Sequence, residues 1–176
     1  LLERVAAVEI TADVDDLLAF IVTTCLDSDI GVVDVRLLPR PRRGTACWWP
    51  PFMEAYGCLG SSEQGHGPFF LAWDRPGAPD VHRVARVRSW YQARERARGV
   101  VHWPPILLVC PSEVHEPQWA SALESLAERR DEHPLEVVVI RTDDSLRDDV
   151  LTGEYWRRPS SSFGAPFFQV LRWTDS

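Results

Sequence analysis

The chain has 176 residues, with 26 acidic against 19 basic side chains, which gives a formal net charge of −7. All 19 basic residues are arginine, and neither lysine nor asparagine occurs. Their absence excludes a Schiff-base lysine, a P-loop lysine, a Ser-Lys dyad and an N-glycosylation acceptor. The length and the 45% hydrophobic content suit one domain with a sizeable core.

The first part of the chain predicts one helix followed by three strands. Residues 12–28 place apolar side chains three and four positions apart, as on one face of a helix. Residues 31–38 are rich in β-branched side chains and predict a strand, whereas the proline-rich stretch 39–51 predicts a loop. Residues 52–60 and 68–74 then predict the two strands of a hairpin.

The second part alternates helices with strands. The predicted elements are a helix over 80–99 capped by Asp80, a strand over 104–110, a helix over 116–130, a strand over 135–141, a short helix over 143–150 and a last strand over 166–173. This order predicts a single α/β domain over residues 1–176, with a mixed central sheet and helices on both faces. We expect its core over about 12–141 and a C-terminal helix–strand extension over 142–176.

Metal, redox and membrane motifs do not occur in the sequence. The four cysteines are Cys25, Cys47, Cys58 and Cys110. None forms a C-x-x-C pair, the five histidines show no ligand spacing, and no apolar run is as long as a membrane span. We therefore expect reduced thiols, no cofactor, no membrane partner and a cytoplasmic location. Because the chain begins at Leu1 without methionine, we also expect it to be part of a longer protein.

The charge is distributed unevenly along the chain. Residues 1–35 carry eight acidic residues and one arginine, and residues 113–176 carry thirteen and seven. Residues 36–112 carry five acidic residues and eleven arginines. A basic middle third can give an acidic protein a locally positive face, or its charges can mix with the acids once the chain folds.

Arginines of the middle third form a candidate surface for nucleic acid. At a helical step of about 100° per residue, four arginines of the helix predicted over 80–99 fall within an arc of roughly 120°. The candidate nucleic-acid-binding residues are these four and three from the preceding loop: Arg40, Arg42, Arg43, Arg83, Arg86, Arg94 and Arg98. Trp48 and Trp49 could add aromatic stacking, or could dock a partner domain or chain. The alternative for the arginines is a solvated helix face paired with the surplus acids.

Several segments of the chain resemble one protein family. The segments are DDLLAFIVTTC, the arginine-rich WW segment, Glu54 and Gly57 before the hairpin, FFLAWDRPG, RVRSWY and PPILLVCPSE. Over residues from about 14 to 158, the chain is similar to the replication-relaxation proteins encoded on actinobacterial plasmids and chromosomes. The resemblance implies a nucleic-acid-associated role in plasmid replication and DNA relaxation, with a winged-helix domain upstream. The order helix–strand–strand–strand–helix–strand is also that of restriction-endonuclease-like nucleases, and it implies such a core here.

Two departures from that pattern bear on catalysis. Relatives tend to carry an acidic residue two positions before the aspartate that ends the strand, and this chain has Ala72 there, followed two residues later by Asp74. Where a lysine opens the helix motif, this chain has Arg86, which cannot deprotonate to act as a base. A magnesium-dependent nuclease needs several oxygen ligands that converge on the metal and a group that organises the attacking water. Only Glu54 and Asp74 are left as candidate catalytic residues.

We therefore expect a catalytically inactive, nuclease-like module of a DNA-transaction protein that acts by binding DNA or a partner. Two alternatives stay open at this stage. One is a Mg²⁺-dependent nuclease that uses Glu54 and Asp74. The other is a protein–protein interaction or dimerisation domain that makes no contact with nucleic acid.

Overall fold

The computed structural model describes most of the chain. The described residues are 17–19, 21–23, 25, 30–39, 49–63, 65–75, 77, 79–97, 103–111, 113–130, 135–145, 149–159, 161–171 and 173. Within them, no helix has both the length and the apolar character needed to cross a membrane.

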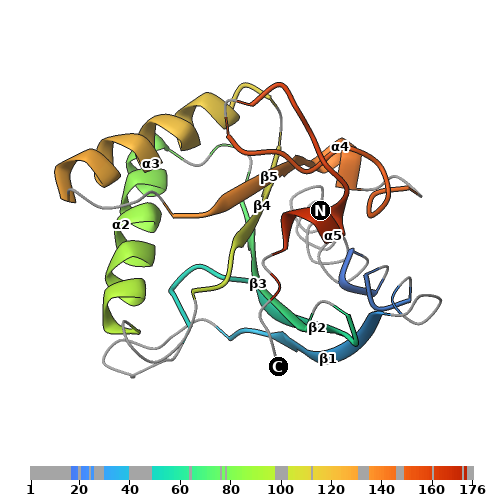
Figure 1. Ribbon diagram of the computed structural model, residues 1–176. Helices are drawn as coiled ribbons and strands as arrows, with labels where there is room; N and C mark the ends of the chain where they lie inside the picture. The colour runs from blue at the N-terminus through green and yellow to red at the C-terminus, as the bar shows by residue number, and fades with distance from the viewer. Residues whose placement is uncertain are drawn as a thin grey trace, which may run out of the picture.

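A five-stranded mixed sheet forms the centre of the fold (Figure 1). Its strands are β1 (Ile30–Leu37), β2 (Ala55–Ser61), β3 (Gly65–Trp73), β4 (Ile106–Cys110) and β5 (Val137–Arg141), and they lie in the sheet in this order. The first three strands are antiparallel neighbours, with a short turn between β2 and β3 and a longer connection between β1 and β2, whereas β3, β4 and β5 run parallel. The predicted α/β class and mixed sheet are confirmed.

Two long helices cover one face of the sheet. Helix α2 (Asp80–Arg96) connects β3 to β4, and α3 (Glu116–Arg130) connects β4 to β5. They pack against each other through the stacked rings of Trp90 and Trp119, whose centroids are 5.4 Å apart. Both helices lie on the same side of the sheet in Figure 1. In open α/β sheets, a ligand-binding crevice arises where two successive crossover connections lie on opposite faces of the sheet. Here both crossovers lie on one face, so no such crevice forms between β3 and β5.

The other face is covered by segments from both ends of the chain. Residues 17–19, 21–23 and 25 are helical and contribute buried apolar side chains to a core cluster with Phe69 and Leu71 of β3. The short helix α5 (Phe167–Val170) packs into the same cluster. The predicted helices on both faces are thus confirmed.

The last predicted strand is wrong. Residues 167–170 form the single turn α5, and this segment enters the core through Phe167 and Leu171. A strand would place Gln169 on the same face as both, but Gln169 is exposed. In the region before α5, Arg157 forms an isolated bridge with Val139 of β5, and Trp156 forms another with Ala165.

Two smaller differences concern helix ends. Pro79 is the N-cap of α2, and no side chain caps that end, because the Asp80 carboxylate instead pairs with Arg83 one turn later. The short helix predicted over 143–150 is the single turn α4 (Thr142–Ser145).

Candidate functional site

Asp74 directly follows β3, and its side chain is fully buried. Its backbone N–H donates to the carbonyl of Val109, which extends the parallel pairing with β4 by one residue. Its Oδ2 accepts two hydrogen bonds, from Arg83 Nε at 3.0 Å and from Trp119 Nε1 at 2.9 Å. Its Oδ1 is buried and has no hydrogen-bond partner among the described residues. The carboxylate therefore ties β3 to both helices and has no solvent-exposed surface.

Arg83 is the principal counter-ion of Asp74. The residue is 2% exposed, and its Nη1 donates to the Asp80 carboxylate and to the Gln118 side chain, both at 2.7 Å. Its Nε and Nη1 are thus engaged inside the protein, while Nη2 is buried and has no hydrogen-bond partner among the described residues. Together with Gln118, Arg83 also lines an open cavity of about 410 Å³ between α2 and α3.

Arg86 lies one turn further along α2, between the candidate carboxylates and the aromatic core. Its Nη1 donates to the Trp73 carbonyl at 3.0 Å, and its Nη2 donates to the Phe52 carbonyl at 3.2 Å. The guanidinium also lies over the rings of Trp90 and Trp119, at 5.5 and 5.2 Å from their centroids. Burial lowers the pKa of Arg86, while the charges of Asp74 and Glu54 act in the opposite direction.

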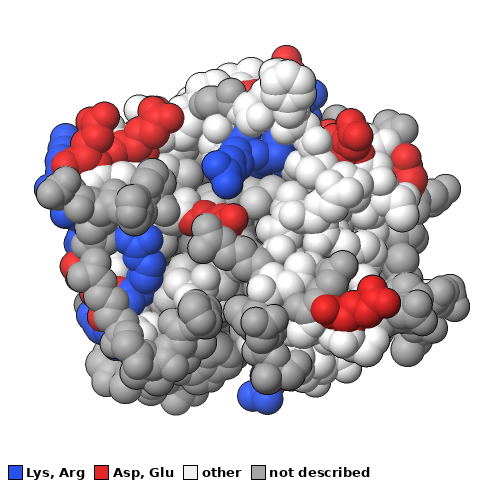
Figure 2. Space-filling model, in the orientation of Figure 1, with Lys and Arg blue, Asp and Glu red and all other residues white. Residues whose placement is uncertain are grey.

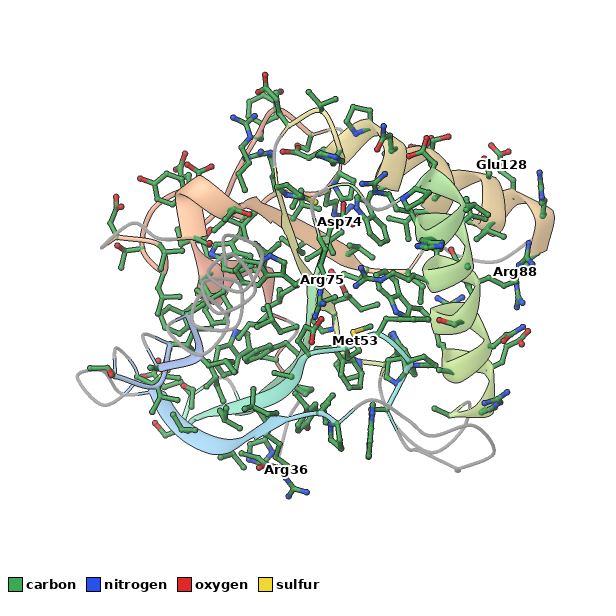
Figure 3. The ribbon with its side chains drawn as sticks, turned by 180° about the vertical axis from the view of Figure 1, so that it is seen from behind. Arg36, Met53, Asp74, Arg75, Arg88 and Glu128 are labelled. Carbon is green, nitrogen blue, oxygen red and sulfur yellow. The ribbon has the colours of Figure 1, made fainter. Side chains whose placement is uncertain are left out.

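Glu54 immediately precedes β2, at the end of the hairpin where β3 finishes. Its backbone N–H donates to the Leu71 carbonyl, and its half-exposed carboxylate lies 3.9 Å from Arg75 Nη2. Since both Glu54 and Asp74 act electrostatically on Arg86, the fold brings the two predicted residues to the same end of the sheet. Figure 3 shows Asp74, Arg75 and Met53 in this region.

The two carboxylates do not form a ready metal site. Ala72, two residues before Asp74, is fully buried in the apolar cluster under α2 and α3 and adds no ligand atom. Among the described residues, no group of three or more histidine, cysteine, aspartate or glutamate side chains is placed to hold a metal ion.

The predicted arginine surface is divided by the fold. Arg83 and Arg86 point into the protein, and Arg94 is half-buried with its guanidinium 4.9 Å from the centre of the Tyr91 ring. Trp49 is half-buried against the cluster under α2 and α3. The remaining candidates lie outside the described residues: Arg40, Arg42, Arg43, Arg98 and Trp48.

Other arginines are exposed on the two helices, and acidic residues are interleaved with them. The exposed charged residues along α2 and α3 beyond their first turns are Arg88, Glu95, Arg96, Glu124, Glu128 and Arg129. Figure 2 shows blue and red side chains mixed on the side of the molecule where these helices lie, and Figure 3 places Arg88 and Glu128 on their outer surfaces. The described parts of α2 and α3 therefore carry mixed charge rather than one positive face.

A second buried carboxylate was not predicted from the sequence. Glu116, in the first turn of α3, is 6% exposed and accepts hydrogen bonds from Arg157 through both of its oxygens and from Arg141 Nε at 3.3 Å. The hydrogen bond to Glu116 raises the pKa of Arg157. The sequence carries no signal for this cluster, because Glu116 and Arg157 are 41 positions apart.

Comparison with known proteins adds no relative to this description. The chain matches no protein-family model, no curated protein and no solved structure. The fold and the side chains described above are therefore the basis for the proposals below.

Proposed function

We propose that this domain is a catalytically inactive, restriction-endonuclease-like module of a DNA-transaction protein, of the kind that acts in plasmid or mobile-element replication. It works by binding nucleic acid or a partner rather than by cleavage. The order β1-β2-β3-α2-β4, with an antiparallel meander and a parallel fourth strand, supports the nuclease-like core. The environment of Asp74 is the observation that supports inactivity.

A catalytic carboxylate must reach the metal and leave room for its water ligands. Mg²⁺ binds at about 2.0–2.1 Å and usually keeps several waters. Asp74 has no exposed surface, and its Oδ2 is engaged by Arg83 and Trp119. Because the unpartnered Oδ1 is buried as well, a hydrated metal could reach the carboxylate only if the Asp74–Arg83 pair opened, and breaking a buried pair is unfavourable by several kcal/mol, of the order of 3–5.

The group beside the carboxylates is equally unsuited to nuclease chemistry. Arg86 stays protonated at any physiological pH, even though burial lowers its pKa. It is held by two backbone carbonyls and does not form an ion pair with either candidate carboxylate among the described contacts. A guanidinium in this place stabilises the end of the hairpin and cannot activate a water.

The inactivity is tested with supercoiled plasmid DNA in the presence of Mg²⁺ or Mn²⁺. We expect no nicking by the wild-type chain and the same result for Asp74→Ala. Cleavage that disappears in Asp74→Ala but persists in Asp80→Ala would overturn the proposal, because both residues pair with Arg83 and only Asp74 is a candidate ligand.

The binding activity is tested by titrating labelled duplex and single-stranded DNA at low salt. We expect binding that weakens steeply as salt is added, because phosphate contacts release counter-ions. A chain that binds neither form at low salt and that elutes as a stable dimer would instead be an interaction domain.

A further inference from the structure

Phe52 has an unusual combination of backbone conformation and exposure. Its φ of 66° lies in the left-handed region, and among the described residues it is the one non-glycine residue with a positive φ. Its side chain is nevertheless 55% exposed. A bulky residue held in this region is disfavoured by about 1–3 kcal/mol, and such strain persists only where the surroundings impose it.

Contacts from helix α2 impose this conformation. The carbonyl of Pro51 accepts a hydrogen bond from Trp90 Nε1 at 3.0 Å, and the next carbonyl, that of Phe52, accepts one from Arg86 Nη2 at 3.2 Å. The next residue, Met53, is again buried. Two consecutive carbonyls are thus bound by α2, and the ring of Phe52 is left at the surface.

The ring has a cation beside it. The Arg86 guanidinium carbon lies 5.9 Å from the centre of the Phe52 ring, so the ring is held by a cation–π contact as well as by its backbone. Phe52 is therefore a fixed, partly exposed aromatic surface rather than a mobile side chain. Fixed aromatic rings are suited to stacking because little conformational freedom is lost when a ligand binds.

A second, exposed arginine lies close by. The Arg75 side chain is 53% exposed, is 3.9 Å from the Glu54 carboxylate, and is near enough to Arg86 to repel its charge. Asp74 and Asp80 share Arg83, whereas Arg75 faces the partly exposed Glu54 carboxylate only at the outer limit of an ion pair, so its exposed guanidinium can still contact an anion. An exposed aromatic ring next to a positively charged arginine matches a nucleotide, which has a flat base and an anionic phosphate.

We propose that Phe52 is a stacking platform for an unpaired base of single-stranded nucleic acid, with Arg75 contacting the adjacent phosphate. This inference rests on the proposed binding of nucleic acid and assigns a site to that binding. A single strand is favoured over a duplex because a base inside a duplex has both faces covered by its neighbours. A peptide is disfavoured because the arginine beside the ring fits an anion.

The experiment measures binding of a labelled oligonucleotide of about 20 nucleotides, longer than a typical single-strand site, by fluorescence anisotropy at low salt. Phe52→Ala should weaken binding by about 5- to 150-fold, which corresponds to the loss of one base–aromatic stack. Phe52→Trp should bind the oligonucleotide with about the affinity of the wild type, because the indole ring can also stack on a base. Phe52→Gly, which tolerates the positive φ and so removes the strain, should bind as weakly as Phe52→Ala although it folds without difficulty.

Phe163→Ala is the matched control, because Phe163 is an aromatic residue that is 84% exposed in another part of the chain. It should bind as the wild type does. Arg75→Ala should reduce the slope of log affinity against log salt by about 0.7, as expected for one phosphate contact to a single strand.

Three outcomes would overturn the inference. If the oligonucleotide binds equally to Phe52→Ala and Phe163→Ala, the platform is refuted while the proposed binding function stands. If Phe52→Ala changes self-association on sizing but not oligonucleotide binding, the ring belongs to a protein interface. If the wild type binds no single strand at low salt, this site is refuted independently of the cleavage test for inactivity.

Discussion

Among the described residues two carboxylates are buried, those of Asp74 and Glu116, and their hydrogen bonding differs. Asp74 has one oxygen bonded to Arg83 and Trp119 and the other without a partner among the described residues. Glu116 uses both oxygens, which accept from Arg157, and one of them also accepts from Arg141. Both side chains lie where the parallel strands meet the start of α3, so position alone does not explain the difference.

The neighbours of each carboxylate explain it. Asp74 lies under the stacked indole rings of α2 and α3, where the surroundings are apolar and supply few donors. Glu116 lies at the margin of the fold, where a segment from the end of the chain passes along β5 and brings an arginine. A carboxylate in apolar surroundings depends on the few donors that are buried with it, whereas a carboxylate at the margin can also be reached by side chains of segments near the surface.

The largest effect should come from Asp74→Ala. The substitution leaves the buried Arg83 without its main counter-ion, so the free energy of unfolding should fall by about 3–5 kcal/mol. The measurement is urea denaturation followed by tryptophan fluorescence. Asp80→Ala removes a well-exposed partner of the same arginine and should lower the free energy of unfolding by about 1 kcal/mol or less. Equal losses in the two variants would contradict the distinction between buried and exposed partners.

A smaller loss is expected for Glu116→Ala. Arg141 and Arg157 are partly exposed and can be solvated when the carboxylate is removed, so we expect a decrease of about 2–3 kcal/mol in the same assay. The control is Glu113→Ala, because Glu113 is an exposed partner of Arg141. If Glu116→Ala were as destabilising as Asp74→Ala, the proposed role of solvent at the margin would be refuted.

The smallest effect concerns Cys110, at the end of β4, on which both carboxylates act. Burial is the largest cause of its raised pKa, and the charges of Asp74 and then Glu116 add to it. The thiol therefore stays protonated in the folded chain, whereas in the unfolded chain it ionises above about pH 8.5. Because only the unfolded state loses this proton, the contribution of the Cys110 thiol to the free energy of unfolding is complete at low pH and is lost as the pH rises.

This contribution is measured as the change of unfolding free energy between about pH 8.5 and 10. Cys110→Ala should make the slope shallower by up to about 1.4 kcal/mol per pH unit. Asp74→Asn and Glu116→Gln should keep most of the slope, because burial is the first cause. A slope that vanished in either variant would show that charge, not burial, keeps the thiol protonated.

Periodicity in the sequence predicts the parts of this fold that are long and regular. The helix predicted over 116–130 has those limits in the structure, and the apolar strands before and after it are found within one or two residues of their predicted ends. The prediction around Phe167 was wrong because a short, mostly apolar segment fits a strand or a helical turn equally well, and only tertiary contacts decide between them.

The site was predictable in part for a similar reason. Glu54 and Asp74 are found at the same end of the hairpin, because antiparallel pairing places the start of β2 beside the end of β3. The inward course of Arg83 was not predictable from its place on a helical wheel. A helical wheel gives the direction in which a side chain leaves the helix. It does not show whether a buried acidic residue of another element lies on that side to pair with it. Likewise, nothing in the sequence signals the positive φ of Phe52, which follows from hydrogen bonds to side chains more than 30 positions away.

The strands lie in the sheet in the same order as in the chain, and this affects how the sheet can be assembled during synthesis. Each strand that leaves the ribosome finds its partner strand already made, so every pairing closes only the segment just synthesised. No strand has to insert between two others. The outer edge of β5 is different, because its bridge at Val139 forms only after Arg157 has been produced. A nascent chain that stalls before that point would present an open strand edge, which favours aggregation.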